Sequence, residues 1–144
     1  MAPVATAQQG RKVPLLGLLH PAFPPPSAGV PTVELLREGL RSMGYVEGKT
    51  IAIETRWGHG KPETLPGLAA ELVRLNVDVL VAVGPAAVIA AKRATAVLPI
   101  IAVDLETGPV ASGLVANLRR PGGNLTGLFL DLPDVTGKWL QLIE

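Results

Sequence analysis

The residues of this chain that could bind or transform a small molecule stand where apolar, strand-like segments end. They are His20 with Pro21, Trp57, the run Gly84, Pro85 and Ala86, and the acidic pair Asp104 and Glu106. In a parallel sheet the carboxyl ends of all strands meet at one edge, and open α/β folds hold their ligands there. The positions of these residues therefore predict one binding edge that is assembled from several loops.

The turn at Gly84 is the most specific of these features. An all-apolar segment, 79–83, runs into Gly84 and Pro85 and then into an alanine-rich segment typical of a helix. A helix that starts at this edge presents backbone N–H groups and the positive end of its dipole to a ligand. The turn lacks the third glycine and the later acidic residue of a dinucleotide fingerprint, so a nucleotide phosphate is a weak prediction. A turn that binds nothing is the alternative.

The side chains around this turn each have a structural alternative as well. His20 could face the same crevice as Gly84, or it could be a loop residue, since no serine or cysteine partner is fixed near it. Trp57 could stack on a ligand or cover the edge of the core. Asp104 and Glu106 would point to one side of an extended segment, where they could receive an ammonium group or cap a loop.

Catalysis and metal binding have no support in the sequence. The chain has no cysteine, and its 2 histidines, His20 and His59, are too far apart in sequence for a metal-ligand spacing. No grouping combines a nucleophile, a base and a residue that orients the base. We therefore predict a binding protein with no catalytic residue, no metal and no cofactor.

The elements that position these residues follow from hydrophobic periodicity. Strands are predicted at 13–19, 50–54, 77–83, 100–103 and 125–130, and helices at 33–43, 65–75, 86–95 and from 134 onward. Glu63 and Thr64 are expected to cap the second helix. Strands that alternate with helices indicate parallel crossover units. The prediction is an α/β doubly wound parallel sheet with the flavodoxin-like strand order 2-1-3-4-5.

Composition excludes several classes of function. The 144-residue chain carries 13 basic and 12 acidic residues and few aromatic ones, so it has neither the positive surplus nor the stacking residues that nucleic acid requires. Its longest apolar run, 79–91, is interrupted by a Gly-Pro pair and is too short to span a bilayer. Near the N-terminus, the tripeptide 5–7, Ala-Thr-Ala, has the small-x-small form that signal peptidase accepts.

Three long stretches of the chain resemble the substrate-binding proteins of an ABC-transporter family that has the type I periplasmic-binding-protein fold. They are REGLRSMGYVEGKTIAIETRW from Arg37, PETLPGLAAELVRLNVDVLVAVG from Pro62 and SGLVANLRRPGGNLTGLFLDLPDVTGKWLQLIE from Ser112. Such proteins have two lobes that close on a small solute, often amino-acid-like, and deliver it to a membrane permease. The resemblance implies a leader remnant or disordered N-terminus at residues 1–12, an N-terminal lobe at residues 13–131, and a truncated crossover helix toward an absent second lobe at residues 132–144.

The resemblance also implies where the solute binds. Contacts from the first lobe would come from the loops after the first, third and fourth strands, around His20, Gly84 and the segment 104–107. That is the edge already indicated by the strand ends. An exported, periplasmic protein that binds an amino acid or a similar small carboxylate is implied. Apolar surface left by the absent lobe would favour self-association.

Two other functions remain open from the sequence. A flavodoxin-like enzyme or cofactor-binding domain would use the same crevice, and a flavin or nucleotide in the purified protein would favour it. The sensor domain of a transcription regulator of similar fold is the other, although the chain shows no helix-turn-helix segment and no basic surplus.

Overall fold

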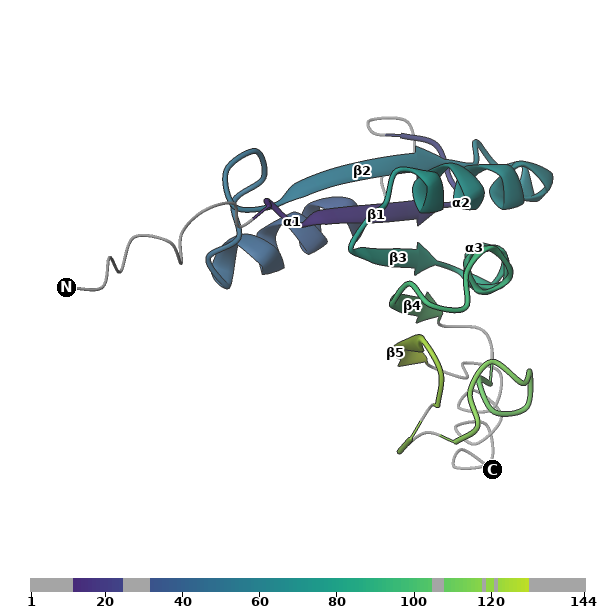
Figure 1. Ribbon diagram of the computed structural model, residues 1–144. Helices are drawn as coiled ribbons and strands as arrows, with labels where there is room; N and C mark the ends of the chain where they lie inside the picture. Colours follow the sequence, from purple (N-terminus) through teal and green to yellow (C-terminus); the bar gives the residue numbers. More distant parts are fainter. Residues whose placement is uncertain (1–11, 25–31, 105–107, 118, 121, 130–144) are drawn as a thin grey trace, which may run out of the picture.

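The computed structural model describes residues 12–24, 32–104, 108–117, 119–120 and 122–129. Parallel strands form a 5-stranded sheet in the order β2-β1-β3-β4-β5, which confirms the predicted class and strand order. The strands are β1 (Leu15–His20), β2 (Ala52–Trp57), β3 (Val79–Val83), β4 (Ile100–Asp104) and β5 (Leu125–Phe129). In Figure 1 they follow one another from β2 at the top to β5 at the bottom.

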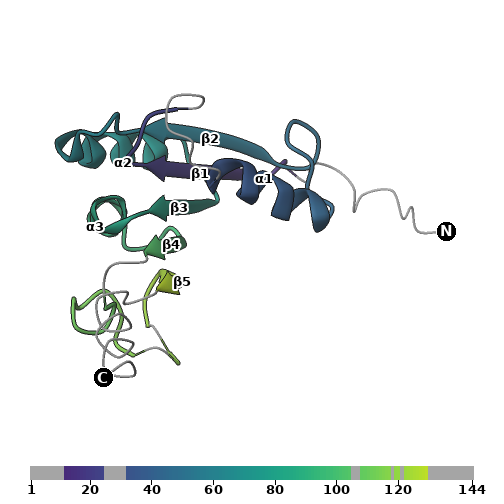
Figure 2. The same cartoon turned by 180° about the vertical axis from the view of Figure 1, so that it is seen from behind.

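Helices connect the strands and lie on both sides of the sheet. They are α1 (Thr32–Ser42), the short 3-10 helix η2 (Pro62–Thr64), α2 (Leu65–Arg74) and α3 (Pro85–Ala94). Figures 1 and 2 show α1 to one side of the strands and α2 and α3 to the other. Such a two-sided cover is what right-handed crossovers between parallel strands produce when the chain reverses its direction across the sheet.

Each face of the sheet has its own hydrophobic core, because alternate residues of a strand point to opposite faces. On one face, α1 packs Val33, Leu36 and Leu40 in a cluster with Leu16, Leu18 and Val81 of the strands. On the other face, α2 and α3 contribute Leu65, Leu72 and Val88 to a cluster with Leu19, Leu80, Ile100 and Leu125. On the α1 face the side chains near β5 are less covered, and Ile101 and Leu128 are 39% and 57% exposed.

The strand boundaries differ from the predicted ones in ways that matter for the site. The second strand was expected at 50–54 and runs from Ala52 to Trp57, so Trp57 belongs to the sheet. The first strand ends at His20 and the fourth at Asp104, so these side chains also belong to strands and their directions are set by the pleat. Pairing with a neighbouring strand, which the local pattern does not show, decides these ends.

Thr64 occupies the predicted N-cap position of α2, but its side chain does not cap the helix. Thr64 has helical backbone angles and makes no side-chain cap hydrogen bond. Its hydroxyl donates to the carbonyl oxygen of Lys61 at 2.7 Å instead, and Glu63 lies within η2. The predicted helix from 134 and, except for Lys12, the predicted N-terminal segment lie outside the described residues.

Candidate binding edge

The structure places most of the predicted site residues along the carboxyl edge of the sheet. His20 ends β1, Trp57 ends β2 and Asp104 ends β4. Pro21 follows His20 directly, and the run from Gly84 to Ala86 joins β3 to α3. Glu106 lies outside the described residues. The edge is therefore a shared feature of four neighbouring strands, and the side chains on it differ in the direction in which they point.

His20 and Trp57 form a ring pair on the α1 face of the sheet. They are register partners in the parallel β1–β2 pair, and their ring centroids lie 5.0 Å apart at an interplanar angle of 46°. Trp57 packs against the α1 core. His20 is only 3% exposed, so the imidazole is a buried polar group. Sequence reasoning treated the two residues separately, and only the β1–β2 register brings them together.

The hydrogen bonding of His20 identifies its tautomer. The backbone N–H of Ala22 donates to Nδ1 of His20 at 3.1 Å, so Nδ1 carries no proton and the neutral ring carries its proton on Nε2. Among the described residues, buried Nε2 has no hydrogen-bond partner. Burial also lowers the pKa of His20 below its usual value, because the imidazolium would lose its hydration. The folded protein thus holds a neutral imidazole at this edge.

A neutral, buried His20 predicts acid sensitivity. The unfolded chain binds a proton at His20 near its ordinary pKa of 6.5, whereas the folded chain resists protonation. The free energy of unfolding should therefore fall as the pH drops through 6.5, and the loss should continue until the lowered folded pKa is passed. Urea unfolding between about pH 7.5 and 5 measures this slope. His20→Asn should flatten the slope, and His59→Asn, at an exposed loop position, should retain it; equal slopes for both variants would contradict the assignment.

Pro21 and Gly84 connect the first and third loops of the edge. Gly84 has a φ of 81°, and a β carbon there would lie 3.7 Å from Cγ of Pro21. The N–H of Gly84 donates to the carbonyl oxygen of Val103 at 2.8 Å, and its carbonyl accepts the N–H of Val88 at 3.0 Å. Pro85 takes the first helical position, where its missing N–H costs nothing. The N–H groups of Ala86 and Ala87 remain at the helix start as donors.

Asp104 ends its strand at the same edge as His20 but lies on the opposite face of the sheet. Asp104 pairs in register with Phe129 and alternates with Ile100 and Ala102, which puts it on the α2–α3 face, whereas His20 lies on the α1 face. The carboxyl group is also fully buried. Two strands that end at one edge can still point their last side chains to opposite faces. The edge therefore has an aromatic side at β1–β2 and a buried acidic side at β4.

Two further aromatic residues at the edge, Phe23 and His59, are not among the predicted site residues. Phe23 lies in the loop after β1, and His59 lies in the loop after β2. Their ring centroids lie 5.5 Å apart in an edge-to-face arrangement. In the sequence, each of these aromatic residues follows shortly after the end of a strand. That pattern indicates a contact only once the pairing of β1 with β2 is known.

A Gly-Lys-Thr triplet, residues 48–50, is not a phosphate-binding loop. It lies in a turn that leads from α1 into β2, whereas a phosphate loop leads from a strand into a helix. The hydroxyl of Thr50 accepts the N–H of Val46 at 2.7 Å, and the N–H of Lys49 donates to the carbonyl of Val46 at 3.0 Å. These groups close the turn on itself.

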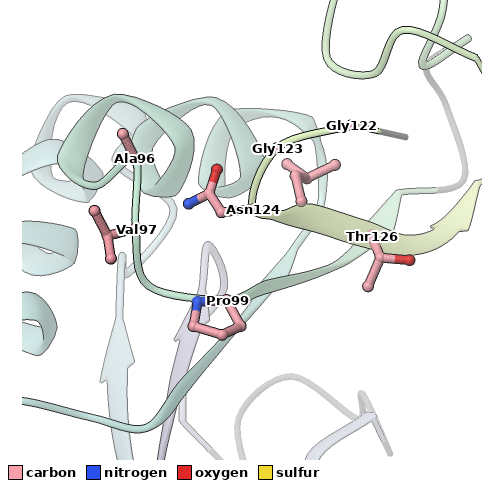
Figure 3. A pocket seen from close by; sticks show the side chains of 8 residues that line it. Ala96, Val97, Pro99, Gly122, Gly123, Asn124 and Thr126 are labelled. Carbon is pink, nitrogen blue, oxygen red and sulfur yellow. The ribbon is translucent and has the colours of Figure 1, made fainter. Parts of the chain in front are cut away.

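A cavity of about 540 Å³ lies at the opposite edge of the sheet, where β4 and β5 begin. Figure 3 shows its lining, which consists of Ala96, Val97, Pro99, Gly122, Gly123, Asn124, Leu125 and Thr126. The amide of Asn124 is already engaged: it donates to the carbonyl oxygens of Leu98 at 2.8 Å and Thr95 at 3.2 Å, and it accepts from Nζ of Lys92 at 3.0 Å. The cavity is a surface hollow beside the hydrogen bonds of Asn124, which we call the Asn124 clamp. Because the polar groups of this side chain are already engaged, the carboxyl edge is the better candidate for a ligand-binding site.

The clamp at Asn124 predicts a loss of stability on its removal. Asn124→Ala would leave two carbonyl groups and the ammonium of Lys92 without this partner, which should cost about 1–3 kcal/mol. Thermal unfolding followed by circular dichroism measures the effect. Asn117→Ala removes a single exposed hydrogen bond to the N–H of Arg120 and should cost less. An Asn124→Ala protein that unfolds at the same temperature as the unchanged chain would show that the clamp contributes nothing.

Metal-ligand clusters and membrane-spanning helices are both absent from the described part of the chain. No group of three or more His, Cys, Asp or Glu side chains in the described ranges could hold a metal ion. No helix in the same ranges is long and apolar enough to cross a membrane.

Comparisons with known sequences agree with one another. A family model described as ABC transporter substrate binding protein matches residues 27–143. The tyrosine-binding protein of Clostridioides difficile (strain R20291) is 32% identical over 101 residues, which cover 67% of this chain and 29% of that protein.

Solved structures show the same architecture. A conserved domain protein from Vibrio cholerae O1 biovar El Tor superimposes with a TM-score of 0.70 at 29% identity, over 82% of this chain and 39% of that one. The ligand-free, open structure of a substrate binding protein with adhesive properties from Clostridium difficile gives a TM-score of 0.71 at 27% identity, over 80% and 38% of the two chains. An ABC domain in complex with L-Trp from Streptococcus pneumoniae shares the fold, with a TM-score of 0.67 at 23% identity over 82% and 39%. The chain thus spans 29% of the curated relative's length.

Proposed function

Because this chain belongs to the family of ABC transporter substrate-binding proteins, we propose that it binds an amino acid or a similar small carboxylate at the carboxyl edge of its sheet. One observation carries the proposal: the same edge holds the His20–Trp57 ring pair and the start of α3. Aromatic rings suit the side chain of an amino acid, and N–H donors at a helix start suit its carboxylate. The name of the tyrosine-binding relative supports an amino-acid ligand.

The chain supplies one wall of the proposed site. Binding clefts bury most of a ligand's surface, and the carboxyl edge of a single sheet covers one side of a ligand only. The remainder of the longer relatives would supply the opposite wall, with residues 132–144 as the crossing segment. The affinity of this chain alone should therefore be weak, with a dissociation constant in the millimolar range.

An NMR titration tests the proposal. The ¹⁵N-labelled chain is titrated with L-Tyr, L-Phe, L-Leu, L-Glu and L-Lys, and amide shifts at Trp57 and Ala86 are followed. At least one of these amino acids should shift both amides in a saturable way, and Trp57→Leu should weaken the effect. Val97→Ala, at a position 88% exposed on the opposite edge, is the control and should bind like the unchanged chain. Absence of any saturable shift would contradict amino-acid binding, and nanomolar affinity would contradict the single wall.

We further propose a role in import outside the cytoplasm. Proteins of this family serve ABC transporters and are generally extracytoplasmic, which supports export of the whole protein and delivery of its solute to a membrane permease. Antibodies against this chain should detect the protein in the periplasmic fraction of its native cell. Detection only in the cytoplasmic fraction would contradict the transport role.

Self-association of the chain is a separate proposal about its surface. Ile101 and Leu128 are exposed apolar residues on the α1 face near the β5 edge of the sheet. The net charge of the chain is only +1, so electrostatic repulsion between two copies is weak. A second copy that pairs along β5 would cover both residues. Light scattering at high concentration should detect dimers, and Leu128→Lys should remove them. A monomer at every concentration would contradict the proposal.

Family membership does not favour the flavodoxin-like cofactor domain or the regulator sensor domain. The cofactor alternative retains a simple check, because purified protein with flavin or nucleotide absorbance would support it.

A further inference from the structure

The Phe23–His59 pair is an exposed aromatic surface that the proposed function does not yet use. The two rings contact each other edge to face, with centroids 5.5 Å apart and an interplanar angle of 80°. Phe23 is 49% exposed, and His59 is exposed as well. Both residues lie in loops that leave the carboxyl ends of β1 and β2, which carry the buried His20 and the partly buried Trp57. The edge thus carries a largely buried ring pair and an exposed one.

Backbone hydrogen bonds hold the two loops together beneath the open pair. The N–H groups of Gly58, His59 and Gly60 donate to the carbonyl oxygens of His20, Ala22 and Pro21 at 2.8, 3.1 and 2.8 Å. These bonds extend the β1–β2 pairing past the ends of both strands. The exposed rings therefore lie on two loops that are hydrogen-bonded to each other. Because these loops are already ordered, ligand binding costs little further conformational entropy.

The local backbone is shaped to place these rings. His59 has a φ of 52°, a left-handed conformation that is uncommon outside glycine but in which histidine, asparagine and aspartate are enriched. A β carbon on Gly60 would lie 3.4 Å from Cε2 of Phe23, so the phenyl ring rests over the glycine backbone. Backbone conformations of this kind cost free energy and persist where the surroundings demand them. Here they present a phenyl ring that is half open to solvent.

We propose that Phe23 and His59 form a platform for the aromatic side chain of the solute and give this chain a preference for aromatic over aliphatic amino acids. The proposal rests on the proposed function and adds a selectivity-determining pair to it. A planar ring can stack on the open part of Phe23 in an offset or edge-to-face geometry, which an aliphatic side chain cannot do. The platform should raise affinity for an aromatic group about three- to tenfold over an aliphatic group of similar size.

Small probes test the platform apart from amino-acid recognition. Indole and cyclohexanol are titrated separately into the full 144-residue chain, and the ring signals of Phe23, Trp57 and His59 are followed by ¹H–¹³C NMR. Indole should produce saturable ring-current shifts at Phe23 and His59, and cyclohexanol should not. Phe23→Leu, which keeps apolar volume, should weaken indole binding about three- to tenfold. His59→Asn, which tolerates the left-handed backbone, should weaken it in the same direction.

The controls separate this proposal from the proposed function. Leu128→Ala, at an exposed position on β5, should bind indole like the unchanged chain, and circular dichroism confirms that each variant is folded. Indole that shifts neither Phe23 nor His59, or that binds Phe23→Leu with unchanged affinity, overturns the platform. Indole shifts at the pair without binding of any amino acid would support the platform and overturn the proposed function. Amino-acid binding that leaves the Phe23 signals unchanged would do the opposite.

Discussion

Replacing Gly127 with alanine should destabilise the protein by about 3 kcal/mol or more, a large part of the total stability of a small domain. Gly127 lies in the middle of β5 with a φ of 156°, and a β carbon there would collide with the carbonyl oxygen of Ala102. The same β carbon would lie 2.7 Å from both the carbonyl carbon and the nitrogen of Ala102. No side-chain rotation relieves contacts with a backbone.

The strand that Gly127 approaches has nowhere to move. β4 is paired with β3 on one side and with β5 on the other, so a shift of Ala102 would break the register with Ala82. The alternative is that β5 detaches, which would expose Leu125 and remove it from the α2–α3 core. Gly127→Ala should therefore either unfold the chain at a much lower urea concentration or free the β5 segment.

Urea unfolding followed by circular dichroism measures the Gly127→Ala effect, and two helical glycines provide matched controls. A β carbon added to Gly39 in α1 or to Gly67 in α2 would meet no atom within 4 Å, and alanine favours helices. Gly39→Ala and Gly67→Ala should each stabilise the chain by about 0.5–1 kcal/mol. A Gly127→Ala chain with an unchanged unfolding midpoint would show that β5 does not pair with β4 as described.

Truncating Leu80 should produce the second large effect, a loss of about 2–5 kcal/mol for Leu80→Ala. Leu80 is 0% exposed in the central strand β3, where it is a register partner of Gly17 on one side and of Ile100 on the other. Its Cδ1 lies 3.3 Å from the position that a β carbon on Gly17 would take, so leucine fills the space that glycine leaves. Alanine would leave a cavity beneath the helices of the α2–α3 face.

Leu80→Ala should also destabilise the candidate binding edge, because β3 leads directly into the Gly84 turn. Chemical denaturation measures the stability change, and hydrogen exchange of the Val83 and Gly84 amides measures the local one. Val97→Ala removes similar atoms from a side chain that is 88% exposed and should change stability by no more than about 0.5 kcal/mol. Equal midpoints for the Leu80→Ala and Val97→Ala chains would contradict the central position of Leu80.

Most of the fold could be predicted from local patterns. The apolar segment 79–83 followed by Gly84 and Pro85 predicts a strand, a turn and a helix start, and the structure has all three. The alternation of such units predicts the parallel sheet and its order. The end of β2 was missed, because Thr55, Arg56 and Trp57 look like the start of a loop until they pair with β1.

The candidate site could be predicted only to the level of the edge. Strand ends in a parallel sheet must meet on one side, so the grouping of His20, Trp57 and Gly84 follows from the order of elements. That Asp104 and His20 lie on opposite faces of the sheet could not be predicted, because the face on which a side chain lies depends on its parity within the registered strand. The contact between Phe23 and His59 could not be predicted for a related reason, since their loops are joined by hydrogen bonds that continue the β1–β2 pair.

The sequence by itself determined the α/β class, the strand order, the family to which the chain belongs and the edge at which we propose that a ligand binds. These properties depend on short-range periodicity, on the topology of crossover connections and on long matching stretches, all of which are present in the order of residues. Only the tertiary structure decided that His20 is a buried, neutral imidazole against Trp57, that Asp104 faces the other way, and that Gly127 must be glycine. Each of these depends on strand register and on distances between residues far apart in the chain, and a change of one residue in register would reverse the faces.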